Sequence, residues 1–319
     1  MTSTVNTSTS TRRLPGATAV ALAATAALLA GCSSSSDHKS DPLSDDKASG
    51  GTVVVGSNNF AESILIADIY GEALKAKGVK VSYKPNIGSR ETTYGLLKSG
   101  SITVLPEYNG ALLAYLDKKA APKTLAATTA AINTKLDSKL TLLDPAPAQD
   151  KDSVAINADT AKKYKLTDKS SIADLKPVAK DLVIGASPEF QTRQQGLEGL
   201  KTVYGLEFKS FKALDVGGPL TKAALKKDTV QAADLFTTDP AISKEKFVVL
   251  QDPENLFGLQ NVQPLVYKSG LSKEGVAALN AVAAKLDTAA LLDMDTQVQL
   301  DNKDPLDVAK AWLKSAGLD

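Results

Sequence analysis

The chain has 319 residues and a formal net charge of +1, and its acidic and basic residues are interspersed, which excludes the basic stripe of a nucleic-acid-binding protein. Its one cysteine, Cys32, and its one histidine, His38, both fall near the N-terminus. No disulfide can therefore form within the chain, and histidine-activated nucleophiles and metal sites built on histidine or cysteine are excluded from the remaining body.

The N-terminal residues match a lipoprotein signal peptide. Arg12 and Arg13 precede an uncharged apolar run at 17–30, which is shorter than the roughly 20 residues of a membrane-spanning helix and fits the apolar region of an export signal. The run ends in Leu29-Ala30-Gly31-Cys32, the pattern of a bacterial lipobox, so we expect cleavage before Cys32 and lipid attachment to its thiol. Arg12-Arg13 could also belong to a twin-arginine signal, but the flanking residues match that motif poorly. The alternative to a signal peptide is a buried Ala-rich helix that ends in Gly-Cys.

These features predict how the chain is organised. We expect a signal peptide at 1–31, a flexible tether at 32–51 and a folded body from 52 onward. The tether is rich in Ser, Asp, Lys and Gly, and such a segment buries too little apolar surface to offset its ordering entropy. The predicted location is extracytoplasmic, anchored by lipid to the cell membrane.

In chain order, the body begins with a β-branched strand at 52–56, followed by a helix with an apolar stripe at 61–77. A strand at 79–83, a helix from the N-cap Ser89 to Lys98, a strand at 102–105 and a helix through 112–116 follow. The pattern then restarts, with strands at 182–185, 208–211 and 232–236 and helices at 192–204 and 219–226. The last stretch, 272–318, reads as helical, with Asp304 as an N-cap and Pro305 after it.

Alternating strands and helices predict an α/β architecture with parallel sheets and crossover helices. The restart indicates two lobes, each with a helix N-terminus near the carboxyl end of its first strand. Ligands bind at that edge of open α/β sheets, and helix N-termini there favour anionic groups. Two such lobes that face each other would form a ligand-binding cleft.

The absence of catalytic motifs favours a receptor over an enzyme. The sequence has neither a G-x-x-x-x-G-K-[ST] phosphate loop nor a G-x-G-x-x-G fingerprint, and no spacing singles out a carboxylate pair. A ligand-capturing receptor without cofactor or metal is the simplest interpretation. A surface lipoprotein enzyme that uses only carboxylates is the alternative from another class.

Several segments resemble the substrate-binding proteins of glycine betaine/choline (osmoprotectant) ABC importers. The resemblance covers the whole body in family order, and its segments are 56–62 (GSNNFAE), 88–91 (GSRE), 106–110 (PEYNG), 186–193 (ASPEFQTR), 236–239 (FTTD), 252–257 and 261–262. It implies a type II periplasmic-binding-protein fold. The first lobe would comprise 52–151 and 258–319, and the second lobe 152–257. It also implies a small-molecule solute and an ABC permease transmembrane subunit as partners, and we expect a monomer.

The resemblance also implies a site between the lobes. Tyr108 matches one tyrosine of the family's aromatic box, Phe236 stands where another ring is usual, and Arg193 matches the arginine that clamps a carboxylate. The complete predicted set of ligand-binding residues is Asn58, Asn59, Phe60, Ser89, Arg90, Glu91, Tyr108, Asn109, Arg193, Phe236, Asp239, Gln260 and Asn261.

Other positions depart from the family pattern. Asn58 stands where a lysine is common, Ala111 replaces a threonine, and Gln260 and Ser153 fall near usual tyrosines. With these rings missing, we expect weak binding of a trimethylammonium group and a preference for a solute that forms more hydrogen bonds with Arg193 and the Asn/Gln side chains. A polyol, a sugar derivative or a phenolic compound remains an alternative solute.

Overall fold

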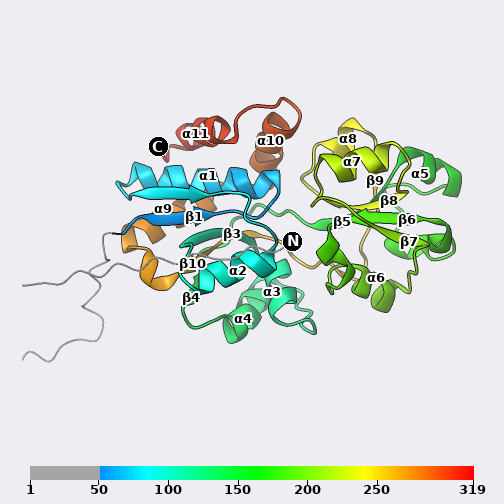
Figure 1. The fold of residues 1–319 in the computed structure, drawn as a ribbon, viewed down its shortest axis with the longest axis horizontal. Coiled ribbons are helices and arrows are strands. Elements are labelled where there is room, and N and C mark those ends of the chain that lie inside the picture. Colours follow the sequence, from blue (N-terminus) through cyan, green and yellow to red (C-terminus); the bar gives the residue numbers. More distant parts are fainter. Residues whose placement is uncertain (1–50) are drawn as a thin grey trace, which may run out of the picture. The chain divides into compact units, whose positions relative to one another are not determined.

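The computed structural model describes residues 51–319, which are coloured in Figure 1. The predicted signal peptide, the lipidation site at Cys32 and nearly all of the predicted tether lie outside the described residues.

The first lobe is built on a five-stranded sheet with helices on both faces (Figure 1). The strand order is β2-β1-β3-β10-β4, and the strands are β1 (Val53–Gly56), β2 (Val81–Lys84), β3 (Val104–Tyr108), β4 (Leu140–Leu142) and β10 (Val262–Tyr267). Its helices from the first half of the chain are α1 (Ala61–Ala76), α2 (Arg90–Lys98), α3 (Asn109–Leu116) and α4 (Leu125–Lys135).

The second lobe repeats this plan with another five-stranded sheet, in the order β7-β6-β8-β5-β9. Its strands are β5 (Asp152–Ile156), β6 (Val183–Ala186), β7 (Ser210–Ala213), β8 (Ala232–Phe236) and β9 (Val248–Val249). Its helices are α5 (Ala158–Tyr164), α6 (Leu197–Tyr204), α7 (Pro219–Lys226) and α8 (Ala241–Lys244). The α/β class and the two-lobed arrangement that the sequence predicts are confirmed.

The predicted parallel pairing is present in both sheets, but each sheet is mixed and also contains strands that run the other way. Strand β10 is antiparallel to β3 and β4, and β5 is antiparallel to β8 and β9. Both β5 and β10 follow a crossing from the other lobe. They therefore enter their sheets at the carboxyl ends of the parallel strands, as shown by the pairs Val262–Tyr108 and Asp152–Phe236.

The C-terminal helices belong to the first lobe. Helices α9 (Lys273–Lys285), α10 (Thr288–Gln299) and α11 (Pro305–Ala316) all pack against α1. The predicted cap of α11 is confirmed, because the Asp304 carboxylate accepts hydrogen bonds from the N–H groups of Leu306 (2.9 Å) and Asp307 (3.3 Å).

The helix predicted at 192–204 begins only at Leu197. A separate 3₁₀ turn precedes it at 188–191. Gly196 lies against that turn, where a Cβ atom would come within 2.1 Å of the Phe190 carbonyl oxygen.

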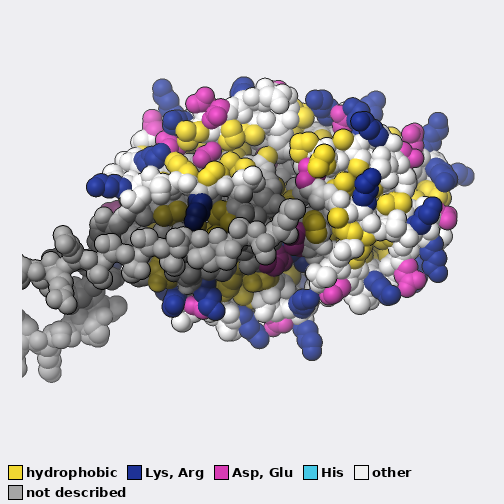
Figure 2. Space-filling view, viewed as in Figure 1, with side chains coloured by type: hydrophobic (Ala, Val, Ile, Leu, Met, Phe, Trp, Pro, Cys, Tyr) yellow, Lys and Arg dark blue, Asp and Glu magenta, His cyan; other side chains and the backbone are white. Residues whose placement is uncertain are grey.

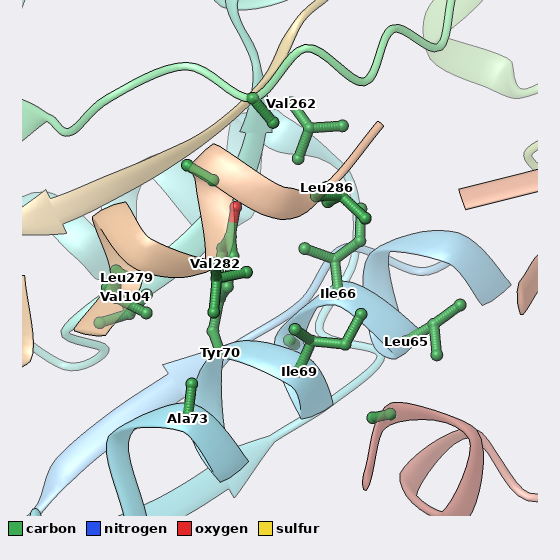
Figure 3. Packing of buried hydrophobic residues seen from close by; sticks show 14 of the residues in the cluster. Leu65, Ile66, Ile69, Tyr70, Ala73, Val104, Val262, Leu279, Val282 and Leu286 are labelled. Carbon is green, nitrogen blue, oxygen red and sulfur yellow. The ribbon is translucent and has the colours of Figure 1, made fainter. Parts of the chain in front are cut away.

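Apolar side chains on alternating strand positions build the cores on the two faces of each sheet. In β3, Val104 joins the cluster under α1, α9, α10 and α11, whereas the next residue, Leu105, joins the cluster under α2, α3 and α4. Figure 3 shows Ile66, Ile69 and Tyr70 of α1 beside Val282 and Leu286. Full burial of such a side chain contributes roughly 1.5–3 kcal/mol. These cores hold the strand ends in place.

On the face shown in Figure 2, the side chains of Lys and Arg are interspersed with those of Asp and Glu. Among residues 51–319, no single helix is long and apolar enough to cross a membrane. Helices α9 and α10 meet that criterion only as a pair bent by 93°.

Candidate solute-binding site

A cavity lies where the carboxyl ends of strands from both lobes meet. It receives Tyr108 from the end of β3 and Phe236 from the end of β8, and Asp152 begins β5 beside it. Its volume of about 50 Å³ has room for roughly 3–5 water molecules. The lining residues are Asn58, Asn59, Phe60, Ser89, Arg90, Tyr108, Ala111, Asp150, Asp152, Ser187, Glu189, Arg193, Val216, Asp234, Phe236 and Gln260.

Three aromatic rings gather at one side of this cavity. The Phe60 ring centroid lies 6.0 Å from that of Tyr108 and 5.0 Å from that of Phe236. Phe60 is the N-cap residue of α1, so the start of this helix brings it between rings of two different sheets. Tyr108 and Phe236 are the two rings assigned to the aromatic box from the sequence, and Phe60, also a predicted site residue, adds a third ring.

The cavity is also lined by three aspartates that are not among the site residues predicted from the sequence. Asp150 precedes β5, Asp152 begins it, and Asp234 lies in β8. Asp234 is 6% exposed, and its Oδ1 atom has no hydrogen-bond partner among the described residues. Burial raises the pKa of Asp234 and Asp150 well above the usual range. A charged residue inside the otherwise apolar run 232–236 was the signal that could have found Asp234.

Both arginines of the cavity are already paired with glutamates. Arg193 of the second lobe bonds Glu91 of α2 through Nε and Nη2, with a shortest distance of 2.9 Å. Burial raises the pKa of Glu91, but the hydrogen bonds from Arg193 and Ser89 outweigh it and hold the pKa at about 2. Arg90 Nε donates to both carboxylate oxygens of the fully buried Glu107 at 3.0 Å.

A buried hydrogen-bond network joins the lobes beneath the rings. The Glu62 carboxyl group of α1 accepts hydrogen bonds from the Tyr108 hydroxyl at 2.5 Å and from the Thr238 hydroxyl of the second lobe at 2.6 Å. Asp295 of α10 is its neighbour, and burial raises the pKa of both carboxyl groups, that of Asp295 to about 7. Each of these neighbouring acids disfavours the ionised form of the other.

The amide side chains near the cavity are largely bonded within the protein. Asn58 Oδ1 accepts from the Thr93 hydroxyl at 2.8 Å. Gln260 accepts from the Ala111 N–H at 2.9 Å and donates to the Phe257 carbonyl at 2.7 Å. Asn109 accepts from the Asn261 N–H, and the Asn261 side chain donates to the Ala146 carbonyl. These contacts connect the crossing segments to the lobes and leave few amide groups for a solute.

The structure thus brings most of the predicted site residues together. Nine line the cavity: Asn58, Asn59, Phe60, Ser89, Arg90, Tyr108, Arg193, Phe236 and Gln260. Four do not: Glu91, Asn109, Asp239 and Asn261. Asn109 and Asn261 are engaged in the backbone contacts above. Asp239 forms an ion pair with Lys222 at 3.0 Å and faces an adjoining cavity of about 620 Å³. Glu91 lies in a smaller cavity behind Arg193.

Within the described part of the chain, no three His, Cys, Asp or Glu side chains are grouped closely enough to hold a metal ion. The groups that characterise the site are aromatic rings, carboxyl groups and two paired guanidinium groups.

Known proteins resemble this chain over nearly all of its body. Residues 51–315 match the family model "Substrate binding domain of ABC-type glycine betaine transport system". The glycine betaine-binding protein YehZ of Escherichia coli (strain K12) is 30% identical over 280 residues, which are 83% of this chain and 90% of that protein.

Two further comparisons are less extensive or less similar. The ergothioneine transport permease/ergothioneine binding protein EgtU of Helicobacter pylori (strain G27) is 27% identical over 168 residues, which are 52% of this chain and only 30% of that protein. A crystal structure of a glycine betaine/carnitine/choline ABC transporter protein shares the fold, with a TM-score of 0.63 and 23% identity over 83% of this chain and 99% of that one. The chain therefore belongs to this family of extracytoplasmic substrate-binding proteins, which bind a small solute and work with an ABC transporter permease.

Proposed function

We propose that this protein captures a small solute with a quaternary ammonium group in the cavity between its lobes and delivers it to the transmembrane subunit of an ABC permease. One observation carries the proposal: the rings of Phe60, Tyr108 and Phe236 and the carboxylates of Asp150, Asp152 and Asp234 surround the same cavity. Ring faces and carboxylates are the two kinds of group that attract a cation that cannot donate a hydrogen bond.

The magnitudes favour this class of solute. A cation over a ring face gains about 2 kcal/mol or more when both are desolvated, and 1.4 kcal/mol corresponds to a tenfold change in affinity. The sequence alone predicts weak binding, because only two rings of the family's aromatic box, Tyr108 and Phe236, are matched in it. Phe60 supplies a third ring, and the buried aspartates add an attraction that the expectation did not include.

A solute that depends on many hydrogen bonds is less well supported. The amides of Asn58, Gln260 and Asn261 are used within the protein, so a polyol or sugar would have to displace internal bonds. Removing a partner from a buried polar group costs about 1–3 kcal/mol.

Isothermal titration calorimetry tests the proposal. The ligands are choline, glycine betaine and the neutral tert-butyl analogue of choline, which has the same shape without the charge. We expect micromolar binding of at least one quaternary amine and no detectable binding of the neutral analogue. Equal binding of choline and its neutral analogue would show that the cavity recognises shape alone and would refute the proposal.

Two finer features belong to the same proposal. The lipobox motif 29–32 supports a diacylglycerol anchor on Cys32 that holds the protein at the outer face of the cell membrane. We also propose that the protein acts as a monomer, because the cavity is lined by the two lobes of a single chain.

A further inference from the structure

We propose that the site selects a net cation, such as an amino alcohol of the choline type, over a zwitterion that carries its own carboxylate, and that Glu91 sets this preference. The inference rests on the proposed function and deepens it by naming the charge of the solute.

Glu91 is already bound to the Arg193 guanidinium group, which a ligand carboxylate would need. Arg193 lines the cavity, and two of its nitrogen atoms donate to the Glu91 carboxylate at 2.9 to 3.2 Å. This two-point contact is the geometry that guanidinium groups form with carboxylates in general. Glu91 therefore takes the place of a solute carboxylate, from outside the cavity.

The other guanidinium group of the cavity, that of Arg90, is also paired within the protein. Arg90 is held by Glu107, whose side chain is fully buried, and both oxygens of that carboxylate accept from Arg90 Nε. Breaking such a pair leaves an uncompensated buried charge, which costs several kcal/mol. The charge of each guanidinium group in the cavity is thus already balanced by a carboxylate of the protein.

The other titratable groups that line the cavity are acidic. Asp234 lines the cavity together with Asp150, Asp152 and Glu189, and its buried Oδ1 atom has no hydrogen-bond partner among the described residues. The Asp150 carboxylate accepts hydrogen bonds from the Thr237 hydroxyl and the Thr238 N–H. A bound cation stabilises the ionised form of these carboxyl groups, whereas a zwitterion brings a further carboxylate among them.

The test compares choline and glycine betaine by calorimetry on the full-length protein and three variants. In the wild type, we expect choline to bind at least tenfold more tightly. Glu91→Gln frees Arg193, so betaine affinity should rise and the preference should shrink at least tenfold. Asp234→Asn should weaken choline binding at least tenfold and betaine binding less, as expected for the loss of a charged partner.

Glu198→Gln is the matched control. Glu198 forms an exposed ion pair with Lys118 of the other lobe but does not line the cavity, so this variant loses an inter-lobe ion pair without changing the site. Its preference should equal that of the wild type.

The possible results test the preference for a cation and the proposed function separately. Tighter binding of betaine by the wild type, or an unchanged preference in Glu91→Gln, would overturn the inference while the proposed function stands. Failure of both solutes to bind a protein with a native thermal unfolding transition would overturn the proposed function, and the inference with it.

Discussion

The buried acid pair behind the rings makes the stability of the protein depend on pH in a defined direction. Asp295 is fully buried in α10, and burial raises the pKa of its carboxyl group from 3.8 to about 7 against the opposing hydrogen bond from the Gln299 amide. The folded state therefore binds a proton that the unfolded state releases over this range. Unfolding free energy must fall as pH rises between these two values.

The magnitude follows from the two pKa values. Between about pH 5 and pH 8, the Asp295 carboxyl group removes about 3 kcal/mol from the unfolding free energy. Asp295→Asn eliminates this loss. It also removes a like charge from Glu62, whose own pKa is raised by burial and by Asp295, and this second effect acts in the same direction.

Urea denaturation of the wild type and Asp295→Asn at both pH values measures the effect. We expect the variant to gain about 3 kcal/mol relative to the wild type on going from about pH 5 to pH 8. Asp293→Asn, an exposed position on the same helix, is the control and should show no such change. A constant difference between Asp295→Asn and the wild type at the two pH values would refute the reasoning.

Three further changes have expected outcomes. Tyr108→Leu should weaken binding of a quaternary amine about thirtyfold by calorimetry, while Tyr108→Phe, which keeps the ring, should stay within about threefold; equal losses would contradict the role of the ring. Gly110→Ala should destabilise the fold by about 1–3 kcal/mol in urea denaturation, because its Cβ would lie 2.2 Å from the Leu259 carbonyl oxygen, whereas Gly95→Ala meets open space and should stabilise by about 0.5–1 kcal/mol. Cys32→Ser should move the protein from the membrane fraction to the soluble fraction on blotting; processing before residue 32 with retained membrane binding would disprove the lipobox assignment.

The local elements of the fold could be predicted because their signals are local. A β-branched run predicts β1, an apolar stripe predicts α1, and Asp304 with Pro305 predicts the start of α11. Strand direction in β5 and β10 could not be derived from these patterns, because it depends on where the chain re-enters a sheet after it crosses between lobes.

The site was predictable only where family resemblance supplied the positions. Tyr108, Arg193 and Phe236 came from that source, and the structure places them around one cavity. The pairing of Arg193 with Glu91 joins residues 102 positions apart in the sequence, so no spacing rule could indicate it. Asp150 precedes β5 and carries no local signal, so only the structure places it at the cavity, whereas Asp234 could have been noticed as a charge within the apolar run 232–236.

The central claim is that a quaternary ammonium group lies among Phe60, Tyr108, Phe236 and the aspartates. A crystal structure of the protein with choline measures this most directly. We predict that the choline nitrogen lies within about 6 Å of the centroids of these rings and beside Asp234. Electron density for choline in the adjoining cavity near Lys222, with the three rings and Asp234 out of contact, would contradict the account.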